Sequence, residues 1–125
     1  MKHKRILLID DEKDLLELLG EFLEASDYEV LKASDGKEGL ALARQEKPDL
    51  ILLDVMMPRM DGYKMCRFLK SQKKCRDIPV ILLTARSQVQ DRKFGKELGV
   101  DAYVTKPFEH GELLKKIKHC LAQNA

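Results

Sequence analysis

The stretch Pro48-Asp49-Leu50-Ile51-Leu52-Leu53-Asp54-Val55-Met56-Met57-Pro58 decides the fold of this chain. Its apolar run, Leu50 to Leu53, is too short for a typical helix, and a proline on each side limits any extension. The run therefore predicts a strand that is buried on both faces. Asp54 ends this strand, and a carboxylate beside a dry core is costly unless it has a partner or takes part in chemistry.

Similar apolar segments recur along the chain, and segments with helical periodicity separate them. The other expected strands are Ile6–Ile9, Tyr28–Ala33, Pro79–Leu83 and Asp101–Thr105. The expected helices carry Leu15 to Leu23, Leu40 to Arg44, Met65 to Leu69, Ser87 to Leu98 and Leu113 to Leu121. Strict alternation of strand and helix predicts a parallel sheet with right-handed crossovers, and the chain is too short for an eight-unit barrel. The expected fold is a single α/β domain over residues 1–125, an open five-stranded sheet with helices on both faces.

Local signals refine three of these helices. Asp35 is expected to cap the second helix, with Glu38 reaching back from the third helical position. Gly20 should weaken the first helix. The fourth helix, Ser87 to Leu98, has few apolar residues and an internal Gly95, so we expect it to be among the least stable elements.

Composition excludes several classes of function. The net charge of the 125 residues is only +2, although 35% of them are charged. Basic and acidic residues are interspersed, which argues against direct nucleic-acid binding, since that would need a basic stripe. The pairs Lys73-Lys74 and Lys115-Lys116 are interpreted as solvated helix faces.

Three cysteines cannot all pair within one chain, and their spacing does not suit a metal site, so they fit a reducing, cytoplasmic location. Cys66 and Cys120 fall on apolar helix stripes and are expected in the core, whereas Cys75 is a candidate for an exposed thiol. The apolar run Ile6–Ile9 is too short for a signal peptide, and no stretch could span a membrane.

Unusual polar residues follow the apolar strands, and parallel strands bring their carboxyl ends to one edge of the sheet, where such folds bind ligands. These residues are Asp10, Asp11, Asp54, Thr84 and Lys106. The three carboxylates would repel unless a cation joined them, and Mg²⁺ suits a few carboxylates with retained waters. A carboxylate surrounded by a metal, an ammonium and a hydroxyl is suited to accept a phosphoryl group.

Each of these residues also has an ordinary structural explanation. Asp10 or Asp11 alone could cap the first helix, Thr84 is a common strand end, and Lys106 alone is surface charge. Asp54 could bond the backbone of the next loop. Because all five are expected at the same edge, the chemical explanation is favoured over a set of independent accidents.

The ordered motifs make the whole chain resemble the receiver domain of bacterial two-component response regulators, as in the chemotaxis regulators. The motifs are Ile6-Leu7-Leu8-Ile9-Asp10-Asp11-Glu12, Leu52-Leu53-Asp54-Val55-Met56-Met57-Pro58, Met60-Asp61-Gly62, Leu83-Thr84-Ala85, Gly99-Val100-Asp101-Ala102-Tyr103 and Lys106-Pro107-Phe108. The resemblance implies a flavodoxin-like fold with strand order 2-1-3-4-5.

The resemblance also implies a phosphorylation site. Asp54 would be phosphorylated by a histidine kinase or a histidine phosphotransfer protein. Mg²⁺ would bind Asp11, Asp54 and the backbone carbonyl of Met56, with Asp10 holding it through water. The protein would be a phosphoacceptor switch and not an enzyme that turns over a substrate.

Three further residues receive roles by resemblance. Thr84 and Tyr103 would form the switch pair, and Lys106 would contact the phosphoryl group. Lys106-Pro107 would be a cis peptide bond. Arg59 departs from a residue that is often glycine, which affects the expected shape of its loop but no ligand.

The expected output surface is formed by the fourth helix, the Asp101–Thr105 strand and the last helix. Its partner, or a missing C-terminal output domain, cannot be named from the sequence. Two other classes of protein share parts of this pattern. A haloacid-dehalogenase-like phosphatase would need a second Asp two positions after its nucleophile, but Glu12 follows Asp10 at that spacing and Met56 follows Asp54. A flavodoxin-like cofactor protein would need a phosphate-binding loop after the first strand, where three acidic residues stand instead.

Overall fold

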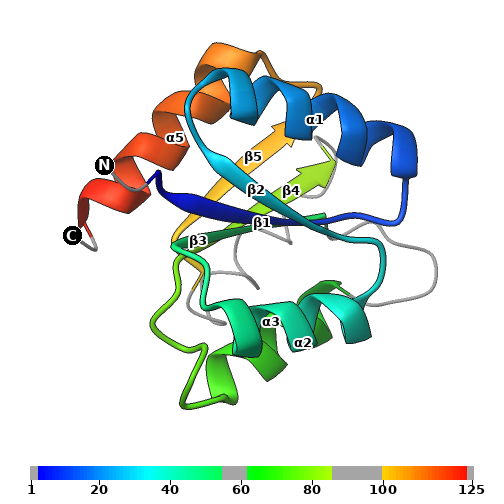
Figure 1. Ribbon diagram of the computed structural model, residues 1–125, viewed down its shortest axis with the longest axis vertical. Coiled ribbons are helices and arrows are strands. Elements are labelled where there is room, and N and C mark those ends of the chain that lie inside the picture. The colour runs from blue at the N-terminus through cyan, green and yellow to red at the C-terminus, as the bar shows by residue number, and fades with distance from the viewer. Residues whose placement is uncertain (1–2, 55–61, 86–99, 124–125) are drawn as a thin grey trace.

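The computed structural model describes residues 3–54, 62–85 and 100–123, and it shows a sheet between two layers of helices (Figure 1). The strands are β1 (Arg5–Ile9), β2 (Glu29–Ala33), β3 (Leu50–Asp54), β4 (Val80–Ala85) and β5 (Ala102–Lys106). The helices are α1 (Lys13–Ala25), α2 (Gly36–Glu46), α3 (Gly62–Ser71) and α5 (His110–Gln123). All neighbouring strands are parallel in the order β2-β1-β3-β4-β5, which confirms the predicted fold. The expected helix Ser87–Leu98 lies outside the described residues.

Alternate residues of the central strands face two separate cores, because successive side chains of a strand point to opposite faces. On β3, Leu50 and Leu52 pack with α1 and α5, whereas Ile51 and Leu53 pack with α2 and α3. Figure 1 shows the same arrangement, with α1 and α5 on one side of the sheet and α2 and α3 on the other. Leu50 to Asp54 are all buried, as expected for a strand covered on both faces.

Some boundaries differ from the predictions. β5 runs one residue further than expected, so Lys106 is its last residue and is held by pairing with Ala85. Lys73 and Lys74 are exposed, but they lie in the turn after α3 and not on a helix. Cys66 and Cys120 are buried as predicted.

The suggestion that Cys75 is exposed was wrong. Cys75 is buried in the core between the sheet and the α2–α3 layer, because the turn after α3 folds back against the sheet. Burial raises the pKa of the Cys75 thiol. It also raises the pKa of the Cys66 thiol, to about 11.

Side chains at the amino terminus of α2 determine where this helix begins. The Asp35 carboxylate accepts a hydrogen bond from the Glu38 N–H at 2.8 Å, which confirms the predicted cap. Glu38 reaches back as expected, but its carboxylate accepts from the Ser34 N–H at 2.9 Å, one residue before the cap.

Gly20 has a packing role in α1 that the sequence did not show. A Cβ atom at Gly20 would lie 2.6 Å from the Lys32 Cε atom, so the glycine leaves room for the Lys32 side chain to cross the helix. The Lys32 ammonium then lies 3.5 Å from the Glu17 carboxylate. None of the helices in the described part of the chain has the length and apolar character needed to cross a membrane.

Candidate functional site

The carboxyl ends of β1, β3 and β5 bring three charged side chains to one edge of the sheet. Asp54 is the last residue of β3, and Lys106 is the last residue of β5. Asp10 directly follows β1, and its N–H donates to the Ala33 carbonyl of β2 at 3.1 Å. This hydrogen bond continues the β1–β2 pairing by one residue, so the backbone of Asp10 is fixed relative to the sheet.

A short ion pair joins the two strand ends. The Lys106 ammonium donates to Asp54 Oδ2 at 2.8 Å. The Asp54 side chain is 3% exposed, whereas the Lys106 side chain is 31% exposed. Lys106 therefore spans from solvent to a buried carboxylate, and the hydrogen bond is of the strong, charge-assisted kind.

Asp10 is buried with only part of its hydrogen-bonding capacity used. Its Oδ1 atom accepts from the Glu12 N–H at 2.9 Å, but Oδ2 is buried and has no hydrogen-bond partner among the described residues. Burial is the main reason that the pKa of Asp10 is raised to about 7. The Asp54 carboxylate raises it further, while the Glu12 N–H and the Lys106 ammonium oppose the rise.

These residues fit a divalent cation that uses few protein ligands. The described part of the chain holds no group of three or more His, Cys, Asp or Glu residues that could hold a metal ion. Mg²⁺ usually takes only one or two carboxylates and keeps several waters. The unpartnered Asp10 oxygen and the electrostatic conflict between Asp10 and Asp54 are features that a cation would relieve. Asp11, which follows Asp10 in the chain, is half-buried, and Met56 lies outside the described residues.

Thr84 and Tyr103 lie on neighbouring strands and on the same face of the sheet. Thr84 is buried near the end of β4, and Tyr103 pairs with Leu82, two residues before it. Tyr103 is half-buried and packs against the core that contains α2 and α3. The Lys106–Pro107 peptide bond is cis, as the resemblance implied.

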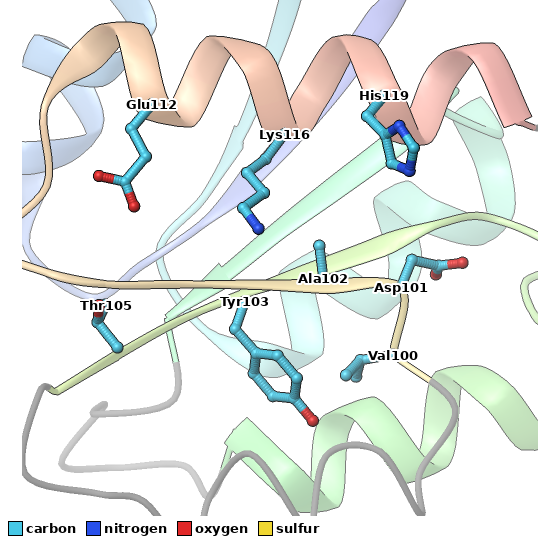
Figure 2. Close-up of a pocket in the computed structure, with 8 residues that line it drawn as sticks. All are labelled: Val100, Asp101, Ala102, Tyr103, Thr105, Glu112, Lys116 and His119. Atoms are coloured by element: carbon cyan, nitrogen blue, oxygen red, sulfur yellow. The ribbon is translucent and has the colours of Figure 1, made fainter.

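A pocket of about 580 Å³ lies along β5 and α5, and the sequence analysis did not single out most of the residues that line it. Figure 2 shows Glu112, Lys116 and His119 projecting from α5 toward β5, with Tyr103 pointing to the opposite side of the strand. The three α5 residues follow a spacing of four and three, which places them on one helix face. The spacing of these polar residues could have been read from the sequence, but only the position of β5 in the structure shows that they line a pocket.

Comparisons with known proteins agree with this geometry. The family model described as "Response regulator receiver domain" matches residues 6–118. The chain is 45% identical over 122 residues to the alkaline phosphatase synthesis transcriptional regulatory protein PhoP of Bacillus subtilis, covering 98% of this chain and 50% of that protein. The chain thus spans about half the length of the curated relatives it matches.

Solved structures show the same fold. The chemotaxis protein CheY4 of Vibrio cholerae superimposes with a TM-score of 0.89 at 29% identity, covering 95% of this chain and 99% of that one. The receiver domain of a Pseudomonas aeruginosa sensor histidine kinase superimposes with a TM-score of 0.87 at 29% identity, covering 97% of this chain and 99% of that one. That structure holds a magnesium ion coordinated in its active-site cleft.

Fold and site together define an α/β protein with an acidic pair and a lysine at the carboxyl edge of its sheet. The chain belongs to the family of response regulator receiver domains, so it is a signalling module of two-component systems. Among the three classes weighed from the sequence, this result selects the receiver domain.

Proposed function

We propose that this receiver domain accepts a phosphoryl group on Asp54 from a histidine kinase or a histidine phosphotransfer protein. The observation that carries the proposal is the 2.8 Å contact between the Lys106 ammonium and Asp54 Oδ2, beside the buried Asp10. The nucleophile in this proposal is a carboxylate oxygen of Asp54. The contact with Lys106 holds a positive charge where phosphoryl oxygens would arrive.

In the proposed transfer, an Asp54 oxygen forms a bond to phosphorus as the bond from phosphorus to the donor's imidazole nitrogen breaks. The electron pair of that bond returns to the imidazole. Lys106 neutralises part of the charge on the phosphoryl oxygens, and the Thr84 hydroxyl donates to one of them. The protein thus takes part in one transfer and keeps the group, as a switch does.

Asp11, Asp54 and the Met56 carbonyl would hold Mg²⁺ directly, and Asp10 would hold it through water. When bound, Mg²⁺ would supply positive charge to the phosphoryl oxygens in transfer. The unpartnered Asp10 oxygen supports this assignment, as does the magnesium ion in the Pseudomonas aeruginosa receiver structure.

The output surface is proposed to lie along β5 and α5, together with the fourth helix. Thr84 and Tyr103 support it because they share one face of β4 and β5, where a movement of the Thr84 hydroxyl would change the space open to the Tyr103 ring. The polar pocket beside Tyr103 offers charged groups of both signs to a partner or to an output domain (Figure 2).

The test of phosphorylation uses a small phosphodonor, so that no kinase has to be known. Incubation with acetyl phosphate and Mg²⁺ should add the mass of one phosphoryl group to the intact protein, and hydroxylamine should remove it. Asp54→Asn should lose this adduct completely. Asp49→Asn is the matched control, since Asp49 is the same residue type but lies at the opposite edge of the sheet, where its carboxylate accepts a hydrogen bond from the Arg5 N–H. It should gain the phosphoryl mass as the wild type does. An adduct that persists in Asp54→Asn would refute the assignment.

A further inference from the structure

Two large apolar side chains stand out on the surface of the described residues. Leu18 of α1 is 56% exposed and Phe68 of α3 is 48% exposed, whereas the other large apolar residues described are buried or half-buried. Each lies near the middle of its helix, on the side away from the core. The two helices cover opposite faces of the sheet (Figure 1).

Acidic side chains surround Leu18. Asp14 and Glu21 are its neighbours one helical turn before and after, and Glu17 is adjacent in sequence. All three are exposed. The helix α1 carries four acidic residues and one basic residue, Lys13. Lys32 from β2 lies 3.5 Å from Glu17 and balances only that carboxylate.

Basic side chains surround Phe68. Lys64 and Arg67 are exposed on the same helix, and the Arg44 guanidinium of α2 lies 5.9 Å from the centre of the Phe68 ring. Residues 62–78 contain six basic residues and one acidic residue, Asp77. The net charge of +2 for the whole chain therefore conceals a difference in charge between α1 and residues 62–78.

We propose that these two surfaces bind each other between copies of this chain, with Leu18 of one copy packing on Phe68 of the next. The acidic side chains of α1 would then face the basic side chains around Phe68. A second copy fits better than a nucleic acid does, because it covers both exposed apolar residues and pairs both sets of charges. A nucleic acid would use the basic surface alone.

The topology determines the form of such an assembly. Since α1 and α3 lie on opposite faces of the sheet, each contact uses a different surface on the two copies, which is a heterologous, head-to-tail arrangement. One α1 surface and one α3 surface remain free at the ends, so association continues beyond a dimer. Its charges are exposed and screened by salt, so binding is weak and is lost at high ionic strength.

Sedimentation velocity over a series of protein concentrations measures this association. At low salt, about 20 mM NaCl, the weight-average sedimentation coefficient should rise with protein concentration, and at about 0.5 M NaCl it should not. Two charge-reversed double variants test the contact. One is Glu17→Lys with Glu21→Lys, and the other is Lys64→Glu with Arg67→Glu.

Each double variant alone should lose the concentration dependence, because its two surfaces then carry the same sign. An equal mixture of the two should regain it, since each reversed surface meets an opposite charge on the other variant. Lys115→Glu with Lys118→Glu on α5 is the matched control, which changes the net charge equally and should associate like the wild type. Circular dichroism confirms that every variant is folded.

Three results would overturn the proposal. One is a sedimentation coefficient independent of concentration at low salt, and another is a mixture that associates no better than its components. The third is binding of a labelled DNA duplex that is lost with Lys64→Glu and Arg67→Glu while the protein itself stays monomeric. That result would assign the basic surface to nucleic acid.

Discussion

Charged side chains of the described residues lie at both ends of the strands, but their contacts differ between the two edges of the sheet. At the amino edge, where the strands begin, charged side chains form ion pairs and hydrogen bonds between neighbouring helices and strands. At the carboxyl edge, where the strands end, Asp10 and Asp54 are buried, and the Lys106 ammonium bonds to Asp54. The comparison contrasts charged residues that stabilise the fold with charged residues that we propose bind a ligand.

Arg5 connects three elements at the amino edge. Its guanidinium donates to the Glu46 carbonyl at 2.7 Å and to the Glu46 carboxylate at 2.6 Å, at the end of α2. A cation is favourable there because the helix ends in unpaired carbonyls. The Arg5 N–H donates to Asp49 before β3, and Arg5 Nε, although it makes no hydrogen bond in the described part of the chain, lies 3.7 Å from the Glu29 carboxylate of β2.

Asp101 makes a second connection at the amino edge. Its carboxylate accepts from the Val80 N–H at 2.9 Å, which joins the starts of β4 and β5. The Lys70 ammonium of α3 lies 3.6 Å from the same carboxylate and donates to the Ile78 carbonyl at 3.0 Å. Charges at this edge therefore meet opposite charges or backbone dipoles.

The carboxyl edge lacks this balance. The Asp10 and Asp54 carboxylates repel each other when both are charged. One Asp10 oxygen is also buried without a hydrogen bond among the described residues. Such an arrangement costs stability unless a cation joins it. This difference supports the proposal that the carboxyl edge, and not the amino edge, binds the cation and the phosphoryl group.

The largest stability effect is expected when Asp10 loses its charge. Its pKa of about 7 lies above the ordinary value of 3.8, so the folded protein binds a proton more tightly than the unfolded chain does. The stabilising proton is fully present below pH 3.8 and is lost as pH rises through about 7. In EDTA at about pH 8, Asp10→Asn should therefore be more stable than the wild type, by on the order of 2 kcal/mol in urea denaturation.

The control for this prediction is the same substitution at the amino edge. Asp101→Asn removes an attraction to Lys70 and should lose about 0.5 kcal/mol. The gain for Asp10→Asn should be largely lost at about pH 4, because the folded wild type then keeps the Asp10 carboxyl protonated and uncharged. A loss of stability for Asp10→Asn at the higher pH would show that the Asp10 charge is structural, and the contrast between the edges would fail.

Local patterns in the sequence were sufficient to predict the fold and the position of the site. Buried runs such as Leu50 to Leu53 identify strands without reference to the rest of the chain, and alternation with helices then fixes a parallel sheet. The placement of Asp10, Asp54 and Lys106 at one edge followed from that topology. The structure confirms that these three residues meet there.

What the sequence could not show depends on contacts between distant segments. Cys75 is buried because its turn packs on the sheet, and no local periodicity records that packing. The Lys106 bond to Asp54 joins residues 52 positions apart. The separation of charge between α1 and α3 was missed because a net charge averages over faces that only the fold defines.

A second prediction compares the two lysines that contact aspartates. Lys106→Ala removes the ammonium that bonds to Asp54 and lies in the field of Asp10, so in EDTA the folded protein should lose about 1 kcal/mol, because the pair is partly buried. It should still fold. Mg²⁺ should restore most of this loss in thermal denaturation, since the metal supplies the missing charge to the same carboxylates.

Lys70→Ala at the amino edge provides the matched control. It should lose a similar amount, through the Asp101 contact and the Ile78 carbonyl, but Mg²⁺ should restore none of it. Equal responses of the two variants to Mg²⁺ would mean that the metal acts elsewhere. The assignment of the cation to the carboxyl edge would then be wrong.

The smallest expected effect is a change in hydrogen exchange within single strands when beryllofluoride stands in for the phosphoryl group. With Mg²⁺ present throughout, protection should change at Thr84 and around Tyr103, as well as in the predicted fourth helix, Ser87–Leu98. A ligand at Asp54 would draw in the Thr84 hydroxyl, and Tyr103 would adjust because it shares that face of the sheet. The first two helices should change little.

The amino ends of the same two strands are the internal control for this experiment. Val80 and Asp101 are joined by a hydrogen bond, and Lys70 holds that junction, so their exchange should stay constant when the carboxyl ends respond. A response that spreads evenly along β4 and β5 would indicate general stabilisation by the ligand. A response confined to the segments Asp10–Glu12 and Val55–Gly62 would indicate a local contact only, and the β5–α5 surface would no longer be the proposed output face. Protection is therefore expected to change at the carboxyl ends of β4 and β5 and to stay constant at their amino ends. A single hydrogen-exchange data set can then separate a transmitted signal from binding alone.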